Sequence, residues 1–345
     1  MNLERLNLCQ IMPESNDQNN IPTPPPLKEP ISVHRAFIYS ACAPGWGDIY
    51  AGSRLRGYAA LFVFLFCVAW FTWTLTQALA TVVGLLFDSL EGIKAFEMPQ
   101  LPVVSMGISF FGIYFSWLWG MLSAVDTATD RRHHTGNFPQ SSVGWAVALS
   151  WFCPGSGQIY ANDRRFGFIL FGAYLLGFLL IIPAYKQLFL SLTDLAQSGE
   201  LPANDPFAII GIVHELIVRV DYSFGKVYQE SIKYFAVAGT MAALRQGPLK
   251  ADTKWLNPSL TYGTALFGLG WLCPGAGQLL AGRNTIGWGF LAGYFAGKFL
   301  IGLLLGADFI TAETADTLAW IPVVVQWSAM MEAPLRMLKS HIQQH

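Results

Sequence analysis

Four charged residues lie in or beside strongly apolar segments, where a charge is unfavourable unless it has a partner or a function. Lys298 stands eleven residues into the apolar stretch 287–306, and Asp48 belongs to a Pro-Gly-x-Gly run. Asp126 and Glu332 lie near the basic ends of two further apolar stretches. Asp48 and Lys298 could form an ion or proton path, or all four could be structural. We expect an ion pair between Lys298 and Asp48.

The sequence offers little support for catalysis or metal binding. Its six histidines lie in predicted loops, tails or interfaces, so no two suit axial haem ligation from separate spanning helices. The HExxH, GxSxG and P-loop patterns do not occur. Cys42, Cys153 and Cys273 stand near a recurring proline, and small buried hydrophobic side chains explain them better than a three-thiolate metal site. We predict no enzyme activity, no cofactor and no metal.

The composition indicates an integral membrane protein. Hydrophobic residues make up 53% and charged residues 12% of the 345 residues, against roughly 25% charged in a soluble domain. The run 58–87 exceeds the roughly 20 residues that cross a bilayer as a helix. The net charge of -1 argues against a nucleic-acid partner. The expected partners are the lipid bilayer and a protein, which can be a second copy of this chain.

One short phrase occurs three times, as CAPGWGDIYAGSRLRG at 42–57, CPGSGQIYANDRRFG at 153–167 and CPGAGQLLAGRNTIG at 273–287. A further glycine follows each proline by thirteen residues, and this shared register indicates three homologous units. The motif positions at which we expect a helix break are Pro44, Gly45, Gly47, Asp48, Pro154, Gly155, Gly157, Gln158, Pro274, Gly275, Gly277 and Gln278; the later glycines are Gly57, Gly167 and Gly287.

Each unit contains three helical segments, which we call A, B and C. Segment A is short and carries the motif, segment B is long and apolar, and segment C returns toward a basic end. In chain order the ranges are 36–52, 142–161 and 259–281 for A, and 57–87, 167–189 and 287–306 for B. Segment C is about 103–126 in the first unit and 317–335 in the third; in the second it is less apolar, contains several charges such as Glu230, and ends in 234–246.

The sequence therefore predicts an all-α integral membrane fold of three homologous helical repeats with pseudo-threefold symmetry. It has about six spanning helices and three short broken ones. The predicted parts are a disordered cytoplasmic tail 1–35 and membrane repeats 36–135, 140–250 and 256–340. In the last repeat Gly289, Gly293 and Gly297 recur at spacing four, which predicts a groove for close helix approach.

The loops predict the orientation. Those between A and B and after C are basic, whereas the B–C loops 88–97, 193–205 and 307–316 are acidic. By the positive-inside rule the basic loops and the N-terminus are cytoplasmic in a multi-pass protein of the cell membrane, which we expect to be a bacterial inner membrane. Segment A then begins and ends on one side and is re-entrant. Two copies of A have about 20 residues, enough to span, so that alternative stays open.

The motif suits a break in a membrane helix. Proline withholds a backbone donor, and glycine adopts conformations closed to other residues. A break frees backbone groups that lipid cannot satisfy, and the amide of Gln158 or Gln278 can bond them. One interpretation is a packing and capping device. The other is that the three breaks line a polar site, as broken helices do in transporters.

The order of a short apolar helix, PGxGQxY, a few polar residues with Arg, and a glycine opening a second apolar helix resembles the small two-helix bacterial membrane domain called TM-two and its PGxGQ relatives. Here it stands in three tandem copies. "SAVDTATDRR" at 123–132 is similar to the end of the third helix of those relatives. Copy one departs by Asp48 in place of glutamine, and copy three by Leu280 in place of tyrosine. The resemblance implies a membrane module and no catalytic residues.

From these features we expect a non-enzymatic membrane scaffold or assembly subunit that holds a partner. The alternative is a small-solute or ion transporter or channel with a polar site at the PGxG breaks.

Overall fold

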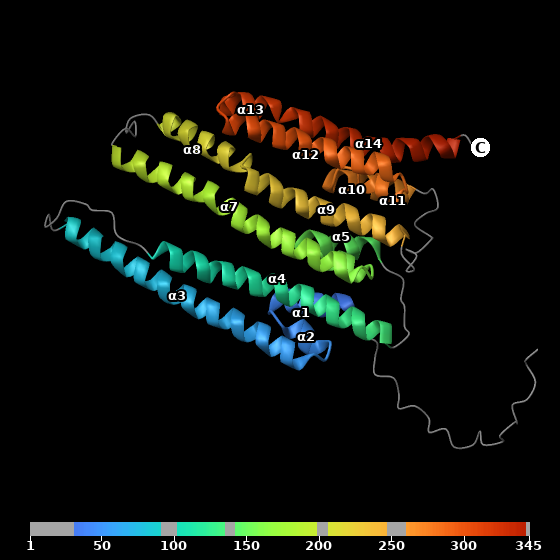
Figure 1. Cartoon of the computed structure of the whole chain (residues 1–345), viewed down its shortest axis with the longest axis horizontal. Helices are drawn as coiled ribbons and strands as arrows, with labels where there is room; N and C mark the ends of the chain where they lie inside the picture. Colours follow the sequence, from blue (N-terminus) through green and yellow to red (C-terminus); the bar gives the residue numbers. More distant parts are fainter. Residues whose placement is uncertain (1–30, 91–101, 135–141, 199–205, 247–259, 343–345) are drawn as a thin grey trace, which may run out of the picture. The chain divides into compact units, whose positions relative to one another are not determined.

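The computed structural model describes residues 31–90, 102–134, 142–198, 206–246 and 260–342. Within these ranges all regular structure is helical, which agrees with the predicted all-α class. The expected tail 1–35 and the acidic loops 88–97 and 193–205 lie for the most part outside the described residues. The helices (Figure 1) are α1 (Val33–Cys42), α2 (Trp46–Tyr50), α3 (Arg54–Leu90), α4 (Val103–His134), α5 (Val143–Phe152), α6 (Ser156–Tyr160), α7 (Arg164–Ser198), α8 (Pro206–Asp221), α9 (Phe224–Gln246), α10 (Leu260–Leu272), α11 (Ala276–Leu280), α12 (Asn284–Gly306), α13 (Ala312–Leu318) and α14 (Trp320–Ile342).

Among the described residues, four helices are long and apolar enough to cross a membrane. They are the stretches Arg54–Gly84 of α3, Val104–Arg132 of α4, Arg164–Leu192 of α7 and Asn284–Gly306 of α12. This confirms the predicted membrane class. Helices α9 and α14 have 23 residues each, enough length to span, but they are not among the helices that are also apolar enough. The expected number of about six spanning helices therefore stays a prediction.

The three motif copies follow the same backbone path. In each, a helix of segment A ends before the proline and a five-residue helix begins after the first glycine. That glycine has a positive φ in all three copies: 89° at Gly45, 101° at Gly155 and 88° at Gly275. A side chain with a Cβ is strained there, which explains why the residue after the proline is glycine in every copy.

The late glycine of each copy has a different reason, which is close approach of backbone. A Cβ on Gly155 would collide with the carbonyl oxygen of Gly167, and a Cβ on Gly167 would lie 2.6 Å from the carbonyl oxygen of Gly155. The pairs Gly45–Gly57 and Gly275–Gly287 have the same arrangement. The glycines thirteen residues after each proline are therefore the points at which segment B crosses the break.

Each five-residue helix ends in a Schellman motif, which turns the chain into segment B. In copy two, the amide of Asn162 donates to the carbonyl of Ile159 at 3.0 Å and that of Asp163 donates to the carbonyl of Gln158 at 2.8 Å. Asn162 has φ 70°, and asparagine is the usual substitute for glycine at this position. Gly52 and Gly282 take the same place in the other copies, with φ 90° and 82°.

Segment A is a hairpin whose two ends lie together. The backbone amide of Ser142, just before α5, donates to the hydroxyl of Tyr160 at the end of α6, at 3.0 Å. The amide of Ser32, just before α1, donates to the hydroxyl of Tyr50 at 3.3 Å. The tyrosine of the motif therefore closes the hairpin in two copies, and Leu280 replaces it in the third.

In each unit, the helix of segment C packs against the helices of segments A and B. Helices α1 and α3 pack on α4, α5 and α7 on α9, and α10 and α12 on α14. The other face of a C helix meets the next unit, because α4 contacts α6, and α9 contacts α11 and α12. The described helices of the first and third units make no extensive contact with each other. The expected pseudo-threefold symmetry of the packing is thus wrong: among the described helices the units contact one another in linear order.

The predicted glycine groove on α12 is only partly right. A Cβ on Gly293 or Gly297 would lie 3.8 Å and 3.7 Å from side chains of α14, which is ordinary packing, and one on Gly289 would meet nothing within 4 Å. The tight approach lies further along, at Gly302, where a Cβ would collide with the backbone carbonyl of Tyr222. Tyr222 lies at the break between α8 and α9, and the sequence pattern gave no sign of that break.

Candidate functional site

The polar residue of each PGxG break is fully buried and bonded to the C helix of its own unit. The side-chain nitrogen of Gln158 donates to the carbonyl of Ala236 on α9 at 2.5 Å. That of Gln278 donates to the carbonyl of Ala329 on α14 at 2.6 Å. The hairpin of segment A is thereby fastened to the helix behind it.

Asp48 also joins segment A to the C helix of its unit, but as a hydrogen-bond acceptor and not as a donor. Its Oδ1 accepts hydrogen bonds from the hydroxyls of Ser123 at 3.0 Å and Thr127 at 2.8 Å, both on α4. The carboxyl oxygen of Asp48 accepts hydrogen bonds, whereas the amide nitrogens of Gln158 and Gln278 donate them. The departure of copy one from the motif is therefore matched on its C helix, which presents hydroxyl donors where α9 and α14 present carbonyl acceptors.

The carbonyl three residues before the proline is satisfied from segment C in two copies. The indole nitrogen of Trp117 donates to the carbonyl of Ala41 at 2.8 Å, and the side-chain nitrogen of Gln326 donates to that of Trp271 at 2.5 Å. Each break nevertheless leaves one buried oxygen without a hydrogen-bond partner among the described residues: Asp48 Oδ2, Gln158 Oε1 and Gln278 Oε1.

Asp126 and Glu332 each pair with two arginines near the basic helix ends. Asp126 has a side chain only 4% exposed, yet it contacts Arg164 of the second unit at 2.6 Å and Arg56 at 3.6 Å. Glu332 pairs with Arg283, the arginine of motif copy three, and with Arg336 at 2.7 Å. Asp126 thus links two units, and Glu332 joins two segments of one unit.

Lys298 pairs with Glu230 and not with Asp48, so that prediction is wrong. The Lys298 Nζ lies 2.5 Å from Glu230 Oε2, and the two side chains are 19% and 30% exposed. Lys298 lies on α12, which packs on α9 where Glu230 stands, whereas Asp48 lies on α2 against α1, α3 and α4. Glu230 could have been found from the sequence only as one of several charges in the weakly apolar segment C of the second unit.

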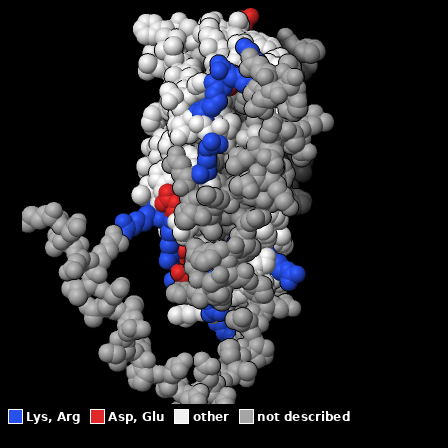
Figure 2. Space-filling view, turned by 90° about the vertical axis from the view of Figure 1, so that its right-hand side faces the viewer, with Lys and Arg blue, Asp and Glu red and all other residues white. Residues whose placement is uncertain are grey.

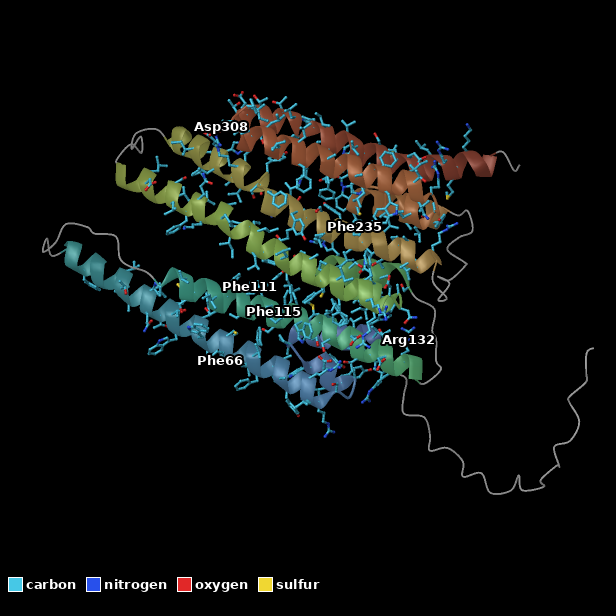
Figure 3. All side chains as sticks on the ribbon, viewed as in Figure 1. Phe66, Phe111, Phe115, Arg132, Phe235 and Asp308 are labelled. Atoms are coloured by element: carbon cyan, nitrogen blue, oxygen red, sulfur yellow. The ribbon has the colours of Figure 1, made fainter. Side chains whose placement is uncertain are left out.

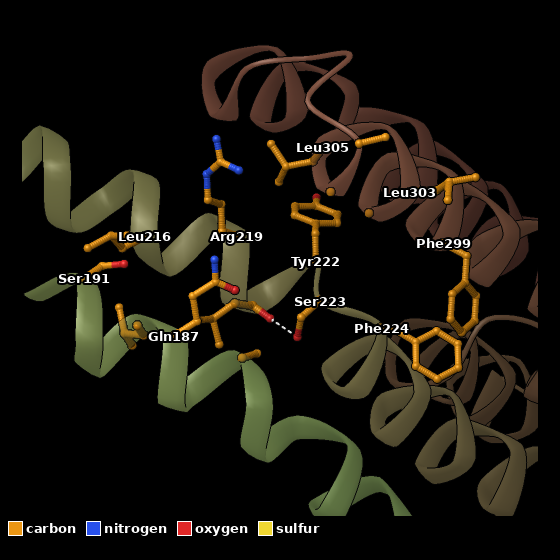
Figure 4. Close-up of a pocket in the computed structure, with 16 residues that line it drawn as sticks. Gln187, Ser191, Leu216, Arg219, Tyr222, Ser223, Phe224, Phe299, Leu303 and Leu305 are labelled. Atoms are coloured by element: carbon orange, nitrogen blue, oxygen red, sulfur yellow. Dashed lines mark hydrogen bonds between the residues drawn. The ribbon is translucent and has the colours of Figure 1, made fainter.

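A hollow lies between α7, the α8–α9 break and α12 (Figure 4), and Phe299, the neighbour of Lys298 in the chain, lines it. Its volume is about 780 Å³, and leucines and phenylalanines line much of it. Its polar groups include Gln187, Ser191 and Arg219, and Arg219 is also paired with Glu215 and Asp308 at 3.3 Å and 3.2 Å. No PGxG residue lines this pocket, so the breaks and the cavity are separate features.

One end of the helix array carries a concentration of positive charge. Figure 2 looks onto the end where α4, α9 and α14 finish, and Lys and Arg side chains are spread along the visible part of it. Arg132 lies at this end and Asp308 at the opposite one (Figure 3). The basic residues at these helix ends are Arg54, Arg56, Arg131, Arg132, Arg164, Arg165, Arg245, Arg283, Arg336 and Lys339.

Comparisons of the chain with models of known protein families, with curated proteins and with solved structures gave no match. Within the described ranges, no group of three or more His, Cys, Asp and Glu side chains is placed to hold a metal ion. Cys153 and Cys273 are buried and Cys42 is exposed. The site features that remain are the three fastened breaks, the Lys298–Glu230 pair and the basic end.

Proposed function

We propose that this protein is a non-enzymatic, multi-pass membrane scaffold or assembly subunit, built of three homologous units of the PGxGQ type. Its short broken helices are re-entrant. The membrane we propose is a bacterial inner membrane. The basic end of the protein and its N-terminus face the cytoplasm. The observation that carries the proposal is the use of Asp48, Gln158 and Gln278: each is fully buried and bonded to its own C helix, as a structural fastening requires.

Two features support re-entrance. The start and end of segment A share a hydrogen bond through Tyr160 in one unit and through Tyr50 in another. In addition, α1 and α5 have 10 residues each, and at about 1.5 Å per residue they reach only about half of a hydrocarbon core of roughly 30 Å. A hairpin of that depth enters the bilayer and returns.

The linear order of the units supports a role in assembly. Each C helix except the last receives the next unit on its outer face, so α14 is left with a flank that no described helix covers. Trp327 on this helix is 61% exposed. A helix of a partner protein in the same membrane can add there, as the second and third units add to α4 and α9. Trp73 on α3 is 65% exposed and provides a matched position at the other end of the order.

The test is purification from native membranes in a mild detergent, followed by measurement of the mass of the intact complex. We expect a partner, or a second copy, in fixed stoichiometry, and we expect Trp327→Ala to release it while Trp73→Ala does not. Recovery of the chain alone, with both variants equal to the wild type, contradicts the scaffold proposal.

A transporter or channel for a small solute or ion is the second candidate, and one observation favours it. The cavity of about 780 Å³ lies where α8 and α9 are separated by a break, and Phe299, next to Lys298, lines it. Interrupted helices form the solute sites of many transporters. Solute flux in proteoliposomes that Glu230→Gln abolishes would support this candidate over the scaffold.

A further inference from the structure

A second hollow lies at the basic end, in the junction between the first and second units. It has two parts of about 420 Å³ and 380 Å³, and both are lined by Arg56, Asp126 and Arg164. Because these three residues belong to both linings, the two parts meet at the arginine–carboxylate cluster. The hollow is thus one crevice with an ionic group in its middle.

The two parts differ in chemistry. The larger part runs between α3, α4 and α7 along apolar side chains that belong to the membrane-spanning stretches, among them Ala59, Val63, Phe115, Trp119 and Phe168. The smaller part lies beside the loop after α2 and is lined by Gly52, Ser53, Asp130 and Arg131. An apolar channel that leads up to arginines at the end of the spanning helices has the shape of an amphiphile.

We propose that this crevice binds one anionic phospholipid, with its phosphate against Arg56 and Arg164 and an acyl chain along the apolar wall. A guanidinium presents five N–H donors in a fork that matches phosphate oxygens. Arg164 donates hydrogen bonds from its Nε and Nη2 to the carboxylate of Asp126, both at 2.6 Å. Its side chain is nevertheless 53% exposed and that of Arg56 is 58% exposed, and both line the two parts of the crevice, so a phosphate can reach them.

Asp126 is a positioning residue in this arrangement. It is buried, lines both parts of the crevice and contacts the two guanidinium groups, which come from different units. A charge-assisted bond to an exposed phosphate then adds to a cluster that is already oriented, which lowers the cost of ordering two long side chains. The lipid would bridge the first and second units.

The corresponding junction between the second and third units is built differently, which makes the site specific to one place. Phe166 holds the motif register that Arg56 holds in copy one, twelve residues after the proline. Its ring packs on Phe235, and Phe235 packs on Trp288 with ring centroids 5.0 Å apart. Aromatic rings there replace the arginine. We therefore expect one lipid for each chain at these junctions.

The experiment uses the full chain, purified in detergent and stripped of lipid, with native mass spectrometry to count bound molecules. The probes are phosphatidylglycerol, diacylglycerol with the same chains, and glycerol 3-phosphate. We expect one phosphatidylglycerol to bind, and neither of the others at equal concentration, because the crevice needs both the phosphate and the chain. Equal binding of diacylglycerol overturns the role of the arginines, and equal binding of glycerol 3-phosphate shows a site for soluble anions instead.

Three variants locate the site. Arg56→Gln should weaken phosphatidylglycerol binding by about tenfold, since it removes one charge-assisted contact. Ala59→Trp should block the apolar part and leave both arginines in place, with a similar loss. Arg219→Gln removes an equal charge at the opposite end and should bind like the wild type. Folding of each variant is checked by its elution volume and melting temperature. Binding that is unchanged in folded Arg56→Gln and Ala59→Trp overturns the proposal.

Discussion

Replacement of Gly155 by alanine tests whether the break geometry is what the motif encodes. Gly155 has φ 101°, a conformation that costs a residue with a Cβ about 1–3 kcal/mol. The added Cβ would also collide with the carbonyl of Gly167 and lie 3.2 Å from the amide nitrogen of Phe171. Both are backbone atoms of α7 and cannot rotate away, so a further 1–3 kcal/mol, roughly, follows from overpacking. The expected loss is about 2–6 kcal/mol.

The assay measures the melting temperature of the purified protein in detergent, which is detected as the loss of the monodisperse elution peak on heating. A loss of this size corresponds to a decrease on the order of 10 °C. The matched control is Gly172→Ala on α7, where a Cβ would meet nothing within 4 Å. Alanine there also favours the helix by up to about 1 kcal/mol, so its melting temperature should stay equal or rise. Equal melting of the two variants would refute the role given to the first glycine.

Two further predictions concern titratable groups. Lys298→Met and Glu230→Gln should each lower the yield of folded protein in the membrane, because breaking this partly buried pair leaves one charge uncompensated, at a cost below the roughly 3–5 kcal/mol of a fully buried pair, and the double variant should recover much of it; yields that fall additively would show that the two are uncoupled. The pKa of His34 is lowered, first by burial and then by the charge of Arg132. The fold therefore favours neutral His34, and its contribution to stability is present above the unfolded pKa of about 6.5 and lost as pH falls below it. His34→Gln should flatten the decline of melting temperature between pH 8 and pH 5, and an identical decline in both proteins would exclude His34 as its cause.

The breaks could be predicted from the sequence because proline and glycine act on the backbone locally. The register of thirteen residues was visible too, but its cause was not: the contact between Gly155 and Gly167 exists only after segment B has folded back across the break. The same holds for Asp48. Its role depends on Ser123 and Thr127, which lie 75 and 79 residues away along the chain.

Contacts between segments far apart in the chain could not be predicted from the sequence pattern. The position of Lys298 in an apolar segment showed that it needs a partner. That partner, Glu230, lies on α9, and the several charges of this helix lower its hydropathy, so the sequence pattern did not identify it as a membrane helix. The linear order of the units was likewise not encoded in three similar motifs, since identical units can close into a ring or extend in a row. What decides between them is the second face of α4 and α9.

The most direct test of the proposed architecture is the sidedness of the two ends of segment A in the second unit. Single cysteines at Ser142 and Arg165, in a version without native cysteines, flank α5 and α6, and both positions are exposed. Each is treated in intact cells with a membrane-impermeant thiol reagent, before and after permeabilisation. Re-entrant hairpins predict that both react only after permeabilisation. Labelling of one position, but not the other, in intact cells would show that segment A spans the membrane and would contradict the fastened hairpin on which the scaffold proposal rests.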